Sequence, residues 1–267
     1  MLGGSSHFRL FVVLLACISL LQASAQPAEL VTVRHLEGLS NGFLALRTIE
    51  GKLLADGEIT QVAKGDRVTS RVFFRFKDGS MYDDTAIFSQ RGSFRLLSDH
   101  LVEKGPSFKH PMETTLDAST GQVMVRYTDE DGKEQAINEQ LDLPADVANG
   151  LLMTLVKHVQ PKIPETTVSF VAITPNPRLV KLVIVPQGEE PFSHGTIKLK
   201  AMHYAVKVKI GGVTGLLAHL TGKQPPDMQI WVLDGDAPAF VKLEGQFYDG
   251  GPIWRVELAT PAAFPKG

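Results

Sequence analysis

The stretch RVTSRVFFRFKDGSMYDDTAIFSQ, residues 67–90, decides the fold that we expect. Its aromatic side chains Phe74 and Phe76 alternate with basic ones, which is the two-residue period of a strand with one buried face. The dipeptide Asp78-Gly79 then supplies the positive-φ conformation that a tight hairpin needs, and a second apolar run follows it. The stretch therefore predicts an antiparallel β-hairpin.

Similar strand patterns recur along the chain, separated by Gly, Asp and Pro at intervals that suit a meander of hairpins. The expected strands cover residues 93–104, 123–141 as a second hairpin, 167–174, 179–185, 196–210, 228–233, 240–247 and 253–258. Within 196–210 the apolar positions change phase, and we interpret this as a bulge or break near Met202-His203. The segment 211–220 closes another hairpin or forms a short helical turn.

One segment, 144–158, has the pattern of an amphipathic helix. Its residues Val147, Leu151 and Leu155 recur at a spacing of four, and Pro144 suits a first helical turn. The sequence thus predicts a mainly β protein, a large antiparallel sheet with one mid-chain α-helix packed on it.

The N-terminal residues 1–25 predict a cleavable secretory signal peptide. A short polar start precedes the apolar run 10–21, which is too short to span a bilayer, and Ala23 and Ala25 are the small residues that a signal peptidase requires. Cleavage after Ala25 would leave 26–267 as a single β-rich domain without a transmembrane segment. We therefore expect a periplasmic or secreted protein of the bacterial cell envelope.

The single cysteine, Cys17, leaves one alternative open. The sequence Leu14-Leu15-Ala16-Cys17 resembles a lipobox, which would make the protein a lipoprotein anchored through Cys17. Because Cys17 lies inside the apolar run and not at its polar end, cleavage after Ala25 is favoured. That cleavage removes the only thiol, so we expect neither a disulfide nor a thiolate metal site in the mature chain.

The charge balance argues against nucleic-acid binding. The net charge of −2 for the whole chain becomes about −3 once the leader and its single charged residue, Arg9, are removed. Clustered Lys and Arg are needed to neutralise phosphates, and no such stripe is present in the sequence.

Motifs for catalysis or cofactor binding are absent from the sequence, which holds no nucleophile elbow, Walker loop, dinucleotide fingerprint or His-Glu-x-x-His pair. The acidic loop 129–132 lacks the first and last carboxylates of a calcium loop. The histidines His194, His203 and His219 do not match a zinc-ligand spacing. We expect no metal and no cofactor.

The C-terminal third carries the most distinctive motifs, GKQPPD at 222–227, APAF at 237–240 and GGPIWR at 250–255. In these motifs the chain resembles an uncharacterised family of secreted bacterial proteins. Its closing strands also resemble, at the level of the fold, the periplasmic lipoprotein-localisation factors. This second resemblance implies a half-open barrel with a helix against its concave face, a shape that can shelter an acyl chain. A fold resemblance alone does not assign residue roles.

The leading hypothesis is a non-enzymatic envelope binding module for a lipid-like or other hydrophobic ligand, or for another envelope protein. The residues proposed to line its concave face are Leu151, Leu155, Trp231, Phe240 and Trp254.

Ordinary core packing is the alternative explanation of those aromatic residues. Two further functional hypotheses stay open. One is an envelope hydrolase with an acid-base site near His203, His219, Asp234 and Asp236. The other is a structural domain that recruits a partner through an uncovered sheet edge.

Overall fold

A computed structural model describes residues 30–129, 131–174, 176–194, 197–209, 225–236 and 238–259. The predicted leader, Cys17, His219 and the GKQ part of the first C-terminal motif lie outside the described residues. Among the described residues, no helix combines the length and apolarity needed to cross a bilayer.

Fourteen strands form one antiparallel sheet, and its order along the hydrogen-bonded ladder is β8-β7-β6-β5-β4-β3-β2-β1-β14-β13-β12-β11-β10-β9. The strands are β1 (Ser40–Thr48), β2 (Leu53–Lys64), β3 (Arg67–Phe76), β4 (Met81–Ser89), β5 (Arg95–Lys104), β6 (Met112–Asp117), β7 (Gln122–Thr128), β8 (Glu134–Gln140), β9 (Thr166–Ala172), β10 (Arg178–His194), β11 (Ile197–Lys209), β12 (Met228–Leu233), β13 (Ala239–Gln246) and β14 (Ile253–Ala259). The predicted mainly β class and large curved sheet are confirmed.

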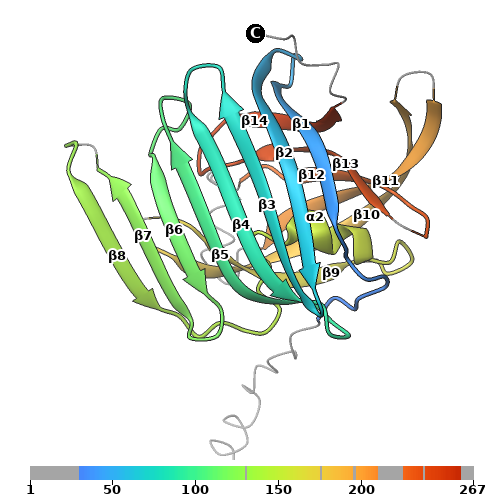
Figure 1. Cartoon of the computed structure of the whole chain (residues 1–267), viewed down its shortest axis with the longest axis horizontal. Helices are drawn as coiled ribbons and strands as arrows, with labels where there is room; N and C mark the ends of the chain where they lie inside the picture. The colour runs from blue at the N-terminus through green and yellow to red at the C-terminus, as the bar shows by residue number, and fades with distance from the viewer. Residues whose placement is uncertain are drawn as a thin grey trace, which may run out of the picture.

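The sheet consists of two meanders that meet in its middle. Strand β1 pairs with β14, so the first and last strands of the chain join β1–β8 to β9–β14. The edge strands β8 and β9 are consecutive in the chain but lie at opposite edges, so the sheet curves without closing. The connection 141–165 must therefore cross the molecule, and Figure 1 shows its helix α2 (Leu152–Leu155) between the two wings of the sheet.

The hairpin of residues 67–90 is present as β3 and β4. Gly79 has φ 86° in its turn, as the Asp-Gly pair predicts. Phe74 and Phe76 point into the core, whereas the preceding Phe73 points outward and has the Arg71 guanidinium 4.9 Å from its ring centroid. The two-residue period was therefore a reliable guide to the inner face here.

The main core lies on the concave face, where both wings and the crossing connection contribute side chains. The largest fully buried side chains include Leu44, Leu46, Phe74, Phe88, Leu116, Leu151, Ile184 and Ile230.

The predicted helix 144–158 is wrong in its extent. Only α2 is α-helical, and it continues as a 3₁₀ turn, η1 (Val156–His158). The preceding residues instead pair with edge strand β9, since the Ala148 N–H donates to the Ser169 carbonyl at 2.9 Å. Gly150, with φ 64°, then ends this pairing before the helix begins. Hydrogen bonding to the edge of β9 therefore replaced the first part of the helix that the apolar spacing predicts.

Asn149 completes the cover of the β9 edge. Its side chain donates to the Val171 carbonyl at 2.9 Å and accepts from the Val171 N–H at 2.8 Å, as a neighbouring strand would. The other edge strand, β8, is almost wholly exposed and carries Glu134 and Glu139. Charged residues on an edge oppose pairing with another chain.

The change of phase in 196–210 also has a different cause from the predicted break. Strand β11 runs unbroken, and the register shift falls on its partner β10, between Pro186 and Gly188. Tyr204 joins the main core, but Ala201 is buried on the opposite face. A second core there comprises Ala201, Trp231 and Val241, with Phe192 and Leu233 packed against it. Both faces of the strand are therefore covered, each over a different part of its length.

Candidate functional site: an apolar cleft, a filled inner site and two polar clusters

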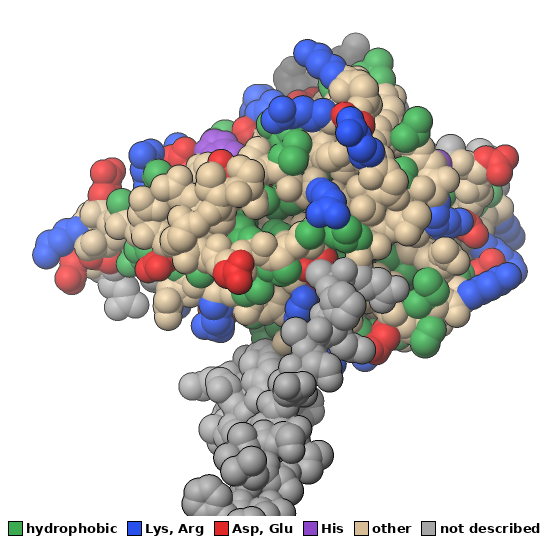
Figure 2. Space-filling model, turned by 90° about the horizontal axis from the view of Figure 1, so that it is seen from below, with side chains coloured by type: hydrophobic (Ala, Val, Ile, Leu, Met, Phe, Trp, Pro, Cys, Tyr) green, Lys and Arg blue, Asp and Glu red, His purple; other side chains and the backbone are tan. Residues whose placement is uncertain are grey.

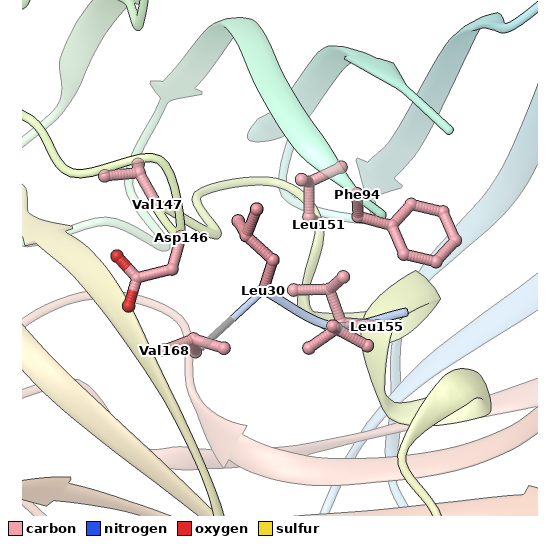
Figure 3. A pocket seen from close by; sticks show the side chains of 8 residues that line it. Leu30, Phe94, Asp146, Val147, Leu151, Leu155 and Val168 are labelled. Atoms are coloured by element: carbon pink, nitrogen blue, oxygen red, sulfur yellow. The ribbon is translucent and has the colours of Figure 1, made fainter. Parts of the chain in front are cut away.

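The space between α2 and the sheet, where a ligand was predicted, is filled by the protein itself. Leu151 and Leu155 line it together with Leu30 and Val31, and the cavity that remains is only about 10 Å³. Figure 3 shows the Leu30 side chain among those of Val168, Leu151 and Leu155. The N-terminal chain thus occupies this inner site.

The other predicted ligand-contacting residues are divided between the two faces of the sheet. Phe240 and Trp254 are buried in the main core, and the Trp254 ring contacts that of Phe76 at 5.4 Å between centroids. Trp231 belongs to the second core on the opposite face. The structure therefore does not bring the proposed ligand wall together as one surface.

A larger apolar cleft lies beside the second core, at the ends of β1 and β14. Its volume is about 410 Å³, within the range of about 300–1,000 Å³ that is usual for small-molecule sites. We call it the outer cleft, and it is lined by Asn41, Gly42, Phe43, Phe192, Leu199, Leu233, Val241, Leu258 and Ala259. Of these nine residues, only Asn41 has a polar side chain, so the cleft suits an apolar ligand.

A polar network flanks the second core. Trp231 donates its indole N–H to Glu190 at 2.8 Å, stacks on the His203 ring at 4.4 Å, and has the Lys242 ammonium 3.6 Å above its own ring. His203 bonds through Nδ1 to Glu190 at 2.8 Å and through Nε2 to Gln229 at 2.7 Å. Both ring nitrogens of His203 are engaged, so neither is free to act as a general base.

The two aspartates of the hydrolase hypothesis lie in an exposed turn after β12. Asp234 lies 4.0 Å from the Arg34 guanidinium, and both Asp234 and Asp236 are exposed. Since His203 bonds to Glu190 and Gln229, the described residues do not show the convergence that acid-base catalysis needs.

Sequence inspection missed a buried cluster of His35, Glu37 and His158. The Glu37 carboxylate lies 2.9 Å from His158 Nε2, 3.3 Å from His35 Nε2 and 2.7 Å from Lys157 Nζ. The two imidazole rings stack with centroids 4.0 Å apart. More than 120 residues of sequence separate the two halves, so only the crossing connection could reveal the cluster.

Three ligand atoms of this cluster lie within 4.8 Å of one another, close enough for a metal ion to bridge them. Two contacts oppose that role. The Arg34 backbone N–H donates to His158 Nδ1 at 3.1 Å, so the neutral ring must carry its proton on Nε2, the atom that faces Glu37. A protonated nitrogen cannot coordinate a metal, and the Lys157 ammonium already neutralises Glu37. The cluster is a hydrogen-bonded lock.

The charges within this lock set the pKa values of its members. Burial alone would raise the pKa of Glu37, but the His158 hydrogen bond and the Lys157 ammonium hold it at about 2. Burial lowers the pKa of His158 and of His35 below the ordinary value, and the nearby cations add to this effect. Glu37 is therefore charged while both imidazoles are neutral near pH 7.

A second buried cluster lies on the concave faces of β4, β5 and β6. We call Asp84, Asp99, Glu103 and Thr114 the acid cluster, because each has a buried oxygen without a hydrogen-bond partner. Burial raises the pKa of Glu103 to about 8 and that of Asp84 to about 6, and it raises the pKa of Asp99 well above its usual range. Protonated carboxyl groups explain how Glu103 and Asp99 tolerate burial.

Comparisons with known proteins give limited information. No protein-family model matches the chain, and no curated protein matches it in sequence. One solved structure is similar, that of a β-barrel-like protein of domain of unknown function DUF1849 from Brucella abortus. The two chains are 9% identical with a TM-score of 0.45, and the match covers 84% of this chain and 96% of the other. A likeness of this size does not carry a functional argument.

Proposed function

We propose that this protein is a non-enzymatic binding module of the bacterial cell envelope that holds the apolar part of a ligand in the outer cleft. The observation that carries the proposal is the cleft itself, with a volume of about 410 Å³ and a nearly continuous apolar lining. The ligand class that fits this lining is an aliphatic chain, such as that of a fatty acid. The predicted leader 1–25 supports the envelope location.

The position of the cleft favours binding over catalysis. Its lining residues Phe192, Leu233 and Val241 belong to or pack against the second core, so the cleft floor is held by the same contacts as the fold. Leu199, by contrast, is 40% exposed at the rim. Apolar contact with a rigid floor gives affinity without a reactive group.

Replacing Leu199 with glutamate is expected to weaken fatty-acid binding at least tenfold. Burying a leucine side chain contributes about 1.5–3 kcal/mol, and the new carboxylate would have to be desolvated against the ligand. Tenfold corresponds to about 1.4 kcal/mol. The measurement is fluorescence titration of the mature protein with cis-parinaric acid.

Leu179→Glu is the matched control, because Leu179 is 38% exposed, lies on β10 and is not part of the cleft lining. It should bind the probe as the wild type does. Equal affinity in wild type and Leu199→Glu, or no binding to the wild type at all, would refute the proposed function.

A further inference from the structure

Residues 30–37, which we call the strap, lie along the end of the β4–β5 hairpin before the chain enters β1. The Phe94 N–H donates to the Val31 carbonyl and the Val33 N–H to the Gly92 carbonyl, both at 3.0 Å. The Gln90 side chain then accepts from the Glu37 N–H at 2.7 Å and donates to the Glu37 carbonyl at 3.0 Å. The strap is attached by local hydrogen bonds and not by a full strand ladder.

The start of the strap fills the inner site described above. Leu30 and Val31 lie against Phe94, Leu151 and Leu155, so two aliphatic side chains occupy the space under α2. The apolar residues Leu151 and Leu155 predicted a ligand site here, and the structure places Leu30 and Val31 of the strap in it. Removing the strap would expose an apolar surface lined by Phe94, Val147, Leu151, Leu155 and Val168.

The far part of the strap is fastened to the end of η1 by the lock of His35, Glu37 and His158. His158 accepts from the Arg34 N–H with Nδ1 and donates to Glu37 with Nε2. Its ring is fully buried and has the Phe94 ring 4.5 Å away. The Arg34 hydrogen bond needs the neutral imidazole, because a proton on Nδ1 would face the Arg34 N–H, whereas Nε2 donates to Glu37 in either state.

We propose that the strap is an acid-released latch, which closes an apolar site under α2 when His158 is neutral and vacates that site when His158 is protonated. This inference does not depend on ligand binding in the outer cleft.

The charges around His158 favour release once it is protonated. The strap presents Arg34, His35 and Glu37 to it, and η1 presents Lys157.

Asp234, from the turn after β12, reaches only Arg34, and the Tyr204 hydroxyl of β11 donates to the Val159 carbonyl. Within the lock a single carboxylate, Glu37, would then face three cations, His35, Lys157 and His158. Repulsion between the stacked imidazoliums adds to the lost Arg34 bond.

The direction of the pH effect follows from the two states. In the open strap His158 has its ordinary pKa of 6.5, and in the closed strap its pKa is lower, so the open state binds more protons. Closure is therefore complete above pH 6.5 and weakens as the pH falls below it. Glu37, with a pKa of about 2 closed and 4.5 open, weakens closure further below about pH 4.5.

The test is backbone hydrogen exchange of the full mature chain, corrected for intrinsic rates, between pH 7.5 and 5. The Arg34 amide, which donates to His158, and the Glu37 amide, which donates to Gln90, should lose protection about tenfold or more over this range. His158→Asn keeps an acceptor for the Arg34 N–H but cannot titrate, so the loss of amide protection between pH 7.5 and 5 should disappear in this variant. His100→Asn, at an exposed histidine of β5, should keep it.

Constant protection of these amides in the wild type, or an unchanged loss of protection in His158→Asn, would overturn the latch. Should His158→Asn not fold, the ¹⁵N shifts of the wild-type imidazole decide, since a charged His158 at pH 7.5 contradicts the proposal. The dye 1-anilinonaphthalene-8-sulfonate should bind with the same pH midpoint as strap opening. Opening without dye binding would overturn the apolar site under α2.

Discussion

Replacing Gly150 with alanine is expected to lower the free energy of unfolding by about 3 kcal/mol or more. A Cβ at this position would lie 2.4 Å from Asp99 Oδ1 and 2.6 Å from the Ala86 Cβ, contacts that are too short to persist. Gly150 also has φ 64°, a backbone conformation that costs alanine strain. Relief would need the crossing connection to move away from β4 and β5, so the loss should appear in urea denaturation of the purified protein.

Gly79→Ala separates the two causes. Gly79 has φ 86°, but its Cβ would meet nothing within 4 Å, so only the backbone strain of about 1 kcal/mol remains. Equal losses in the two variants would show that the connection does not press on the sheet at Gly150.

The second large effect concerns alkaline pH, where the protein is expected to lose stability through its acid cluster. Glu103, Asp84 and Asp99 all have pKa values raised by burial, with that of Glu103 at about 8. The folded state therefore binds more protons than the unfolded state. Stability falls as pH rises from the ordinary carboxyl range through these raised values, by about 1.4 kcal/mol per pH unit for each group in transition.

Urea denaturation at pH 5, 7 and 9 measures this loss of stability. The variant Glu103→Gln isolates the contribution of Glu103, whose pKa in the folded protein is about 8. The amide keeps the size of the side chain without an ionisable group, so the variant should lose several kcal/mol less than the wild type between pH 5 and 9. Glu139→Gln, on the exposed strand β8, should leave the slope unchanged. A wild-type stability that stays flat or rises over this interval contradicts the burial of these carboxyl groups in their protonated form.

The lock and the acid cluster respond to pH in opposite directions: strap closure weakens as the pH falls below 6.5, and the free energy of unfolding decreases as the pH rises. The lock of His35, Glu37 and His158 favours the closed state above pH 6.5, while the acid cluster favours the folded state at lower pH. They lie on different elements, the strap with η1 and the strands β4–β6. Local exchange at Arg34 can therefore be distinguished from global unfolding.

The strands were the most predictable part of the fold, because a strand with one buried face shows its period directly. In β3, Phe74 and Phe76 alternate with charged residues, and Gly79 marks the turn. The period does not reveal which strands pair across long separations. The pairing of β1 with β14 joins residues more than 200 apart, and nothing in either segment specifies the other.

Two local patterns had more than one physical solution. The apolar spacing of 144–158 suits a helix, but the same side chains reach the core equally well when 146–149 covers the β9 edge. The phase change in β11 suits a bulge, but two cores on opposite faces account for it in an unbroken strand. In each case tertiary burial decided between them.

The candidate sites were less predictable than the strands. Leu151 and Leu155 were correctly expected to lie between the connection and the sheet, but their contact with Leu30 depends on where the strap passes. Trp231 and Trp254 have similar sequence surroundings and lie on opposite faces. Trp254 pairs with Gly245, which shares a face with Leu243 and its partner Ile230, whereas Trp231 follows Ile230 and points the other way.

The sequence by itself determined that this chain forms a mainly β, antiparallel protein with a helical segment in its middle, because periodicity and turn residues are local properties, but it overstated the length of that helix. Only the tertiary structure decided that the sheet stays open, that the strap fills the inner site, and that His35 and Glu37 meet His158. Those outcomes depend on where the connection 141–165 crosses the concave face, which is set by the burial available in the folded protein and not by any one segment.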